Sequence, residues 1–329
     1  MKLKANSIVT LAFAIELFVP HQAKADVHPE MKVLERFVGT WKVEQKRKNA
    51  DGLEIWGFGR ATSKIVLGGR YLAYTAITGK DEAYSLFTYD ESKRKYRSWF
   101  FDSNGSQSEW SGTWDDATKT LTRTANLGRG NTGTATSKFL DDNTIEFSLV
   151  LKNRDGKVFV AMNSWFTRQA DAKPLVQKRS KERSASPSEL KSLERMVGKW
   201  SDEGVMKAAV WTPEEVRFKG ESEKFWILGG KCVFSESKDA IFLRTYSTAE
   251  KAVKMWHFNA AGYVHEWTGN WDDGEKTLTL KTDLDGDPTV SSIFKHTITD
   301  EDTISWSAIA TDQAGKVYHH IEGTSKRRK

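Results

Sequence analysis

Alternating apolar and polar residues run through most of the chain. Residues 84–89, 96–101, 107–114 and 118–124 are short runs of β-branched and aromatic residues, and turn signals such as Asn104-Gly105 and Asp115-Asp116 lie between them. A period of two places successive side chains on opposite faces of a strand. About eight to ten such strands at hairpin spacing predict an all-β domain, an up-and-down antiparallel β-barrel.

A short amphipathic helix is expected before the strands. Residues 187–197 place apolar side chains on one helical face. Ser186 is the expected N-cap, Glu189 completes a Ser-x-x-Glu capping box, and Gly198 can close the C-terminus. Residues 29–38 repeat this design.

The whole pattern occurs twice. Residues 110–122 read WSGTWDDATKTLT, and residues 267–279, which begin 157 positions later, read WTGNWDDGEKTLT. The block at 34–41 returns in the same way at 193–200. Self-similarity in a conserved order indicates a repeated structural unit.

The repeat predicts two tandem barrels, because 329 residues are about twice the usual length of one domain. We expect the first barrel over 26–168 and the second over 188–329. The segment 169–187 between them is charged, Ser-rich and poor in large apolar residues, so we expect a flexible linker there.

The first 25 residues are typical of a secretory signal peptide. Lys2 and Lys4 precede an apolar run over 8–20, and residues 23–25 fit a cleavage site. The run is shorter than the roughly 20 residues of a membrane-spanning helix. We expect cleavage after Ala25, a secreted or periplasmic protein, and no stable membrane insertion after cleavage.

Charge and cysteine content exclude some classes. The formal charge is +6, and loss of three lysines and one glutamate with the leader would lower it to +4. This mild excess does not indicate a nucleic-acid partner. Cys232 is the single cysteine, so no internal disulfide can form. The 13 Trp and 17 Phe can fill cores or line pockets.

Several blocks resemble a known family. The segments are LERFVGTW, LGGRYL, YRSWFFDSNG and GTWDDATKTLT. They are similar to the bacterial domain of unknown function 1579, and a short helix running into Gly-x-Trp resembles the calycin superfamily of lipocalins and fatty-acid-binding proteins. The resemblance covers roughly residues 30–168 and 188–328. It implies a lipocalin-like barrel with a cavity for a small apolar or amphipathic molecule, and it brings no catalytic residues.

Candidate ligand-binding residues follow from the alternation. Trp110 and Trp114 share one strand face and Glu109 lies on the other, so the tryptophans can be core or cavity wall. Either glutamate of the repeat, Glu109 or Glu266, can enter the lumen and pair with Arg70 or Lys231 to hold a polar head group, or it can face water. The candidates are Arg70, Trp99, Glu109, Trp110, Trp114, Lys231, Trp256, Glu266, Trp267 and Trp271.

The two halves differ at one of these places. Lys231-Cys232 stands in the second half where Arg70-Tyr71 stands in the first. One cavity can therefore have lost its ligand.

Three alternatives to a small-molecule carrier stay open. A barrel hydrolase or isomerase would use a buried Glu109 or Glu266. A haem-binding, nitrobindin-like barrel would use His319 or His320, since neighbours on a strand face opposite sides. A fully packed barrel would serve only as an interaction module. We expect a binding protein rather than an enzyme, with no cofactor or metal and with unknown protein partners.

Two acidic motifs are expected to be structural. Asp115-Asp116 and Asp272-Asp273 fit turns better than a general acid and base. Residues 283–287 resemble the start of a calcium loop, but Pro288 replaces the required glycine, so a tight loop is expected.

Overall fold

The computed structural model describes residues 27–48, 53–284 and 287–329. The expected leader over 1–25 lies outside the described residues, and so does the centre of the loop expected over 283–287. None of the helices in the described ranges has the length and apolar character needed to cross a membrane.

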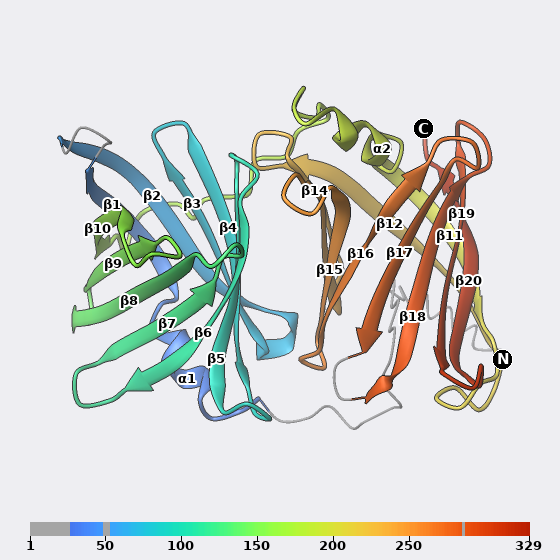
Figure 1. Cartoon of the computed structure of the whole chain (residues 1–329), viewed down its shortest axis with the longest axis horizontal. Coiled ribbons are helices and arrows are strands. Elements are labelled where there is room, and N and C mark those ends of the chain that lie inside the picture. Colours follow the sequence, from blue (N-terminus) through green and yellow to red (C-terminus); the bar gives the residue numbers. More distant parts are fainter. Residues whose placement is uncertain (1–26, 49–52, 285–286) are drawn as a thin grey trace, which may run out of the picture. The chain divides into compact units, whose positions relative to one another are not determined.

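The chain is all-β and forms two closed antiparallel barrels of ten strands each, which confirms the predicted fold class (Figure 1). In each barrel, strands that follow one another in sequence are neighbours, and the first strand pairs with the last. This closure leaves no unpaired strand edge.

One compact unit comprises residues 26–179 together with 227–231. Its described residues include the first barrel, the helix α1 at Met31–Glu35 and a 3₁₀ turn, η1, at Leu67–Gly69. Its strands are β1 Gly39–Lys48, β2 Glu54–Val66, β3 Tyr71–Thr78, β4 Asp81–Asp90, β5 Lys95–Asp102, β6 Gln107–Asp115, β7 Thr120–Asn126, β8 Thr132–Asp141, β9 Thr144–Lys152 and β10 Val158–Arg168.

The other unit contains residues 180–226 and 232–329 of the described chain and forms the second barrel. Its strands are β11 Gly198–Met206, β12 Val216–Ile227, β13 Cys232–Glu236, β14 Ala240–Ser247, β15 Ala252–Asn259, β16 Val264–Asp272, β17 Thr277–Leu284, β18 Asp287–Ile298, β19 Thr303–Asp312 and β20 Val317–Arg327.

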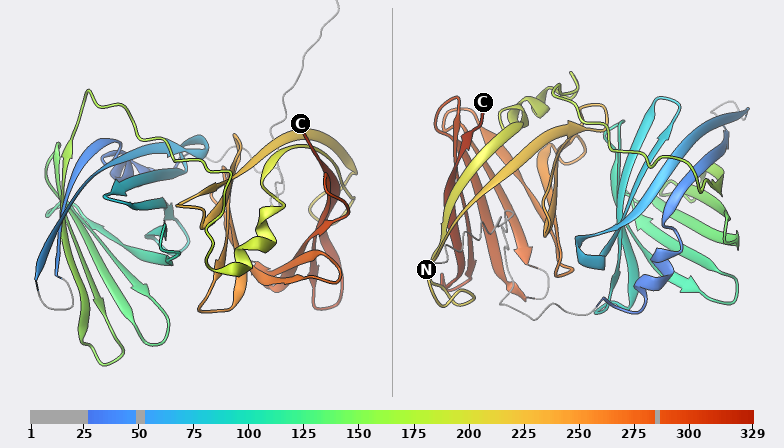
Figure 2. Two further views of the ribbon diagram at one scale, coloured as in Figure 1. Left: turned by 90° about the horizontal axis from the view of Figure 1, so that it is seen from above. Right: turned by 180° about the vertical axis from the view of Figure 1, so that it is seen from behind.

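Helices are shorter than the sequence pattern suggests. α1 covers only Met31–Glu35, and α2 covers only Lys191–Glu194 after a 3₁₀ turn, η2, at Ser188–Leu190 (Figure 2). Pro187, not Ser186, is the N-cap of that turn, and no side chain caps it. The predicted capping box is therefore wrong: packing of the apolar face, rather than capping, holds so short a helix in place.

At the end of the first barrel where α1 lies, the tryptophan of the Gly-x-Trp sequence contacts the segment that follows α1. Trp41 Nε1 donates to the Phe37 carbonyl at 3.0 Å, and the Arg168 guanidinium lies 4.2 Å from the Trp41 ring centroid. Arg168 Nη2 donates to the Arg36 carbonyl at 3.0 Å. Gly39 has a φ of +140°, and a Cβ there would lie 2.4 Å from Arg168 Nη1, which explains the glycine.

The second barrel closes its helix end in the same way. Trp200 Nε1 donates to the Met196 carbonyl at 2.9 Å, and Arg327 lies over the Trp200 ring at 4.3 Å. Arg327 Nη2 donates to the Arg195 carbonyl at 3.0 Å. An arginine from the last strand thus satisfies the free carbonyls at the end of each helix.

Both acidic pairs are turn residues, as predicted. Asp115 accepts the Thr118 N–H at 2.9 Å, and Asp272 accepts the Glu275 N–H at 2.9 Å.

The connecting segment 169–187 has no regular strand, yet it makes defined contacts within each unit. Leu175 N–H donates to Thr62 Oγ1 at 2.8 Å, and Ser180 forms an isolated antiparallel bridge with Trp226.

Candidate functional site

The strand register identifies the lumen face of the first barrel. Trp41, Ala61, Phe139 and Ile145 come from four strands and pack in one cluster, with Trp114 against it. Side chains from so many strands can meet only inside the barrel. Trp110 has the same phase on β6 and packs with Ala125 and Ala135, so both tryptophans face the lumen.

The opposite phase places Glu109 and Trp99 on the outer face, where β5 pairs with β6. Arg97 Nη2 lies 2.7 Å from Glu109 Oε1, and Arg97 Nη1 lies 3.2 Å from Asp90 Oδ2. The Arg97 guanidinium lies 4.8 Å from the Trp99 ring centroid. These residues form an ion-pair cluster on the outside of the wall.

Glu266 and Trp256 of the second barrel lie on the outer face in the same way. Trp256 Nε1 donates to Glu266 Oε2 at 2.8 Å, and Glu266 also pairs with Lys254. The hypothesis of an enzyme that uses a buried Glu109 or Glu266 is therefore wrong about where these carboxylates lie. Neighbouring residues of a strand point to opposite faces of the sheet. Each glutamate directly precedes a lumen-facing tryptophan, so both glutamates point outward.

The two suggested cationic partners lie elsewhere. Arg70 follows η1, and its Nη1 is 3.9 Å from Glu91 Oε1. Lys231 lies in the turn between β12 and β13, where its N–H donates to the Ile227 carbonyl at 3.2 Å. Neither cation pairs with the glutamate that the sequence suggested for it.

A different cation, Arg123 on β7, occupies the lumen of the first barrel. Arg123 is 8% exposed and lies between Leu121 and Ala125 on the inward face of its strand. Its Nη1 donates to Ser98 Oγ at 2.9 Å, and its guanidinium lies 4.9 Å from the Phe87 ring centroid. The Nε atom has no hydrogen-bond partner.

The charge of Arg123 has no counter-ion among the described residues, none of which places a carboxylate within 4.0 Å of it. Burial lowers the pKa of the guanidinium to about 10, and the neighbouring Tyr74 acts weakly in the other direction. Burial also raises the pKa of the Tyr74 phenol. A buried, unpaired charge of this kind costs stability.

Apolar side chains with partial exposure line the lumen between Arg123 and the end opposite α1. They pack with Trp110 in one cluster and are Phe100, Leu127, Phe147, Leu149 and Leu151. Water reaches these side chains, whereas a filled core would exclude it. The first lumen thus combines an apolar wall that water reaches with one buried cation.

The second barrel is filled. At the position of Phe147 it has Trp306, which is 4% exposed, and at the position of Ala135 it has Phe294, which is 1% exposed. Leu280 takes the place of Arg123 and has no exposed surface. At the end opposite α2, Trp211 packs edge-on against Tyr318 at 5.3 Å and contacts this core.

The second lumen nevertheless contains buried polar groups. Arg244 lies 5.1 Å from the Phe242 ring, and His257 stacks on the same ring at 4.4 Å. Burial, followed by repulsion from neighbouring cations, lowers the pKa values of His257 and His296 well below their usual value. Both nitrogens of His257 and Nδ1 of His296 have no hydrogen-bond partner.

Asp202 and Lys224 are two further charged groups in this lumen, and both contact Ser222, to which Lys224 Nζ donates at 3.1 Å. Ser222 Oγ donates to Asp202 Oδ2 at 2.8 Å, and Ser325 also donates to this carboxylate. Burial lowers the pKa of Lys224 to about 8, and the Asp202 charge partly opposes this.

His319 and His320 point to opposite sides of β20, as the alternation predicts. His319 is buried on the lumen face, and burial lowers its pKa to about 4. His320 lies on the outer face, with Nε2 3.2 Å from Glu322. Across the described ranges, no group of three or more His, Cys, Asp or Glu side chains is arranged to hold a metal ion.

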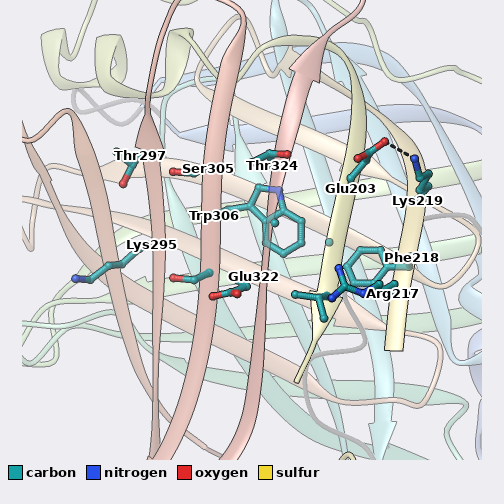
Figure 3. A pocket seen from close by; sticks show the side chains of 14 residues that line it. Glu203, Arg217, Phe218, Lys219, Lys295, Thr297, Ser305, Trp306, Glu322 and Thr324 are labelled. Atoms are coloured by element: carbon teal, nitrogen blue, oxygen red, sulfur yellow. Dashed lines mark hydrogen bonds and ion pairs between the residues drawn. The ribbon is translucent and has the colours of Figure 1, made fainter. Parts of the chain in front are cut away.

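A groove of about 700 Å³ crosses the wall of the second barrel over β11, β12, β18, β19 and β20 (Figure 3). Gly204 and Gly323 leave room there for Trp306, whose ring stacks on Phe218 at 6.1 Å. The rim is charged but largely neutralised, since Glu203 and Lys219 pair at 2.6 Å.

Arg123 was not among the ligand-binding residues predicted from the sequence. One signal was available: Leu121, Arg123 and Ala125 alternate on one face, and the second half has Leu280 where the first has Arg123. A leucine at the matching position of the second half indicates that this position faces the core. An arginine there is therefore expected to be buried.

The solved structures that match this chain are distant from it in sequence. A protein of unknown function of the DUF3598 family from Nostoc punctiforme is 10% identical, covering 92% of this chain and 100% of that chain at a TM-score of 0.30. An S-type phycobiliprotein lyase from Guillardia theta is 12% identical, covering 45% and 97% at 0.32. Rv2717c from Mycobacterium tuberculosis is 14% identical, covering 44% and 99% at 0.36. These similarities are too weak to indicate a function.

The family comparison is more specific. No curated protein matches the chain at a significant level. The model of the family described as "protein of unknown function (DUF1579)" matches residues 26–168, which contain the entire first barrel.

Proposed function

We propose that the first barrel binds a small amphipathic molecule with a negatively charged head group. The head group lies at Arg123, and the apolar body lies along the wall formed by Phe100, Phe147 and Leu149. The observation that carries this proposal is Arg123 itself, a buried lumen cation without a carboxylate partner among the described residues.

The chemistry of the head group follows from the donors. A guanidinium presents a planar set of N–H groups that matches a carboxylate or phosphate, and its Nε is without a partner. Ser98 lies beside it, with its hydroxyl accepting from Nη1. A bound anion would supply the missing counter-charge, so a ligand would stabilise the buried cation as well as gain affinity from it.

The second barrel has a structural role in this proposal. Its lumen is filled by Trp306, Phe294 and Leu280. At the matching positions the first barrel has the partly buried Phe147, the smaller Ala135 and the charged Arg123. We take the two barrels to be tandem copies of one lipocalin-like unit, of which the second has lost its ligand space. The protein acts after export, as the leader sequence suggests.

A binding assay with matched ligands tests the proposal. Isothermal titration of a chain that begins at Asp26 compares a long-chain carboxylate with the alcohol of equal length. We expect the carboxylate to bind more tightly, and Arg123→Gln to weaken it about 10- to 100-fold, because a charge-assisted hydrogen bond contributes about 1.5–3 kcal/mol. Alcohol binding should change little.

The control is Arg244→Gln, which removes the buried arginine of the second lumen. It should leave carboxylate affinity unchanged. Equal binding of carboxylate and alcohol by the unchanged chain, or equal losses in both variants, would contradict the proposal. Native mass spectrometry of protein purified from its own host would then identify the natural ligand directly.

A further inference from the structure

Apolar side chains gather at the end of the first barrel opposite α1. They are Leu53, Ile55, Trp56 and Phe58 near the start of β2 and Val158 and Phe159 at the start of β10, and they range from 40% exposed at Ile55 to 65% at Leu53. Arg47 of β1 pairs with Ile55 of β2 and with Met162 of β10. The β1–β2 hairpin and the β9–β10 hairpin are therefore neighbours at one end of the barrel (Figure 1).

Four aromatic side chains with the outward phase lie on the strands at this end, and we call them the aromatic mouth: Trp56, Phe58, Phe159 and Trp165. The Trp56 and Trp165 rings stack at 5.9 Å across β1, and Lys46 Nζ lies 5.7 Å from the Trp56 ring centroid. So much exposed aromatic surface at one place in a protein indicates an interaction site.

Cationic side chains surround the aromatic mouth. Lys46 pairs with Glu54 at 2.8 Å and Arg154 lies 3.7 Å from Asp155, so two of these cations have acidic neighbours. The other cations on the two hairpins are exposed and are Arg47, Lys48, Lys152 and Lys157. Two further carboxylates, Glu44 and Glu146, lie beside Trp165, and Glu44 pairs with Lys42 at 2.7 Å. The cations at this end still outnumber the acidic side chains, so the mouth has a net positive charge.

The second barrel lacks this combination at the same positions. Lys46 pairs with Trp56 and Glu44 with Phe58 in the first barrel. In the second, Val205 pairs with Arg217 and Glu203 with Lys219. Figure 3 shows the resulting Glu203–Lys219 ion pair on the second barrel. The aromatic mouth is thus particular to the barrel that has the accessible lumen.

We infer that the aromatic mouth docks the first barrel onto an anionic phospholipid surface. Tryptophan and phenylalanine favour the boundary between head groups and acyl chains, and each nearby Lys or Arg is attracted to acidic lipid. Lys46 and Lys48 share the outward face of the sheet with Trp56, so acidic lipid head groups can meet the cations while the ring enters the head-group boundary. The inference goes beyond the proposed ligand function and does not depend on it.

Vesicle sedimentation tests this inference. The chain beginning at Asp26 is mixed with vesicles of phosphatidylglycerol and phosphatidylethanolamine, or of phosphatidylcholine alone. We expect binding to the acidic vesicles that weakens as salt is raised from about 50 to 500 mM. Trp56→Ser with Phe58→Ser, which leaves the charge unchanged, should lower the partition coefficient about tenfold or more.

Two further variants separate the contributions. Lys48→Glu with Lys152→Glu changes two exposed outward cations, keeps the aromatic rings and should abolish binding at low salt. Val210→Ser with Val216→Ser removes exposed apolar side chains from the second barrel and should leave binding unchanged. Circular dichroism and the unfolding midpoint confirm that each exposed substitution preserves the fold.

Other results would overturn the inference. These are no binding of the unchanged chain to acidic vesicles, equal binding after Trp56→Ser with Phe58→Ser, or a dimer that this variant dissociates while vesicle binding persists. The last result would assign the mouth to a second copy of the chain. Failure here is distinguishable from failure of the ligand proposal, because the outward-facing Trp56 and Phe58 do not line the lumen and ligand affinity is measured without vesicles.

Discussion

Arg123 is the residue that sets the interior of the first barrel apart from an ordinary core. A guanidinium with one strong hydrogen bond, an unpaired Nε and no carboxylate beside it is held at a cost to folding. Retention of such a group is typical of a binding site, where stability is given up for function.

Arg123→Leu introduces the residue found at the matching place in the second barrel, Leu280. We expect this change to raise the free energy of unfolding by about 1–3 kcal/mol, because it removes a buried unpaired charge and adds apolar contact. Urea unfolding measures the change, and the same variant should lose the carboxylate ligand. A less stable Arg123→Leu protein would show that the guanidinium has a structural role.

In the second barrel, His257 is a buried polar side chain whose replacement by an apolar one should stabilise the fold. It stacks on Phe242, and neither of its nitrogens has a hydrogen-bond partner. His257→Phe introduces the residue found at the matching position, Phe100. We expect it to stabilise the second barrel by about 1 kcal/mol at pH 7 and by about 2 kcal/mol more at pH 5.

The pH dependence has a definite sign. Folding lowers the pKa of His257, so below about pH 6.5 the unfolded chain takes up a proton that the folded chain does not. The native protein therefore loses stability as the pH falls, and the phenylalanine variant lacks this loss. Thermal unfolding at the two pH values measures the difference, and an equal gain at both would contradict it.

At the scale of elements, the end of each short helix depends on an arginine from the last strand. Arg168 donates to the carbonyls of Val38, Arg36 and Asp142 and stacks on Trp41. A five-residue helix has little stability of its own, so these contacts hold α1 against the barrel end.

Arg168→Ala should therefore destabilise the first barrel by about 3 kcal/mol, as several charge-assisted hydrogen bonds and a cation–π contact are lost. Arg168→Lys keeps the charge but not the planar donor set, so we expect it to recover less than half of the loss. Urea unfolding of both variants gives the comparison. Full recovery by lysine would show that charge alone matters.

At the scale of the whole molecule, the two barrels should respond differently to acid. Three buried histidines with lowered pKa values lie in the second barrel: His257, His296 and His319. The described part of the first barrel contains only His28. Each buried histidine costs up to about 2 kcal/mol between pH 7 and pH 5, since unfolding exposes it to protonation.

Calorimetry should show this difference directly. Each compact unit has its own core, so we expect two unfolding transitions. Between pH 7 and pH 5 the transition of the second barrel should move to lower temperature, and that of the first should move little. His257→Phe identifies the second transition by raising it. A common shift of both transitions would show that the barrels do not unfold independently.

Local pattern was enough to predict the fold and some of its details. Strand alternation and turn residues predicted closed antiparallel barrels, and the Asp115 and Asp272 turns formed as expected. The small residue between Trp110 and Trp114 also has a physical reason: a Cβ on Gly112 would lie 1.8 Å from the Thr122 carbonyl oxygen. Such features depend on neighbours in sequence or in the adjacent hairpin.

The candidate site was predicted less well, because alternation divides a strand into two faces without saying which one is inside. Glu109 and Arg123 are both charged residues on strands, yet closure of the barrel put the first outside beside Arg97 and the second inside beside Ser98. The sequence by itself determined the strands, the turns and the repetition of the pattern. Only the tertiary structure decided which charge is buried, which lumen is filled and where aromatic rings stay exposed, since these depend on residues that meet across the barrel from distant strands.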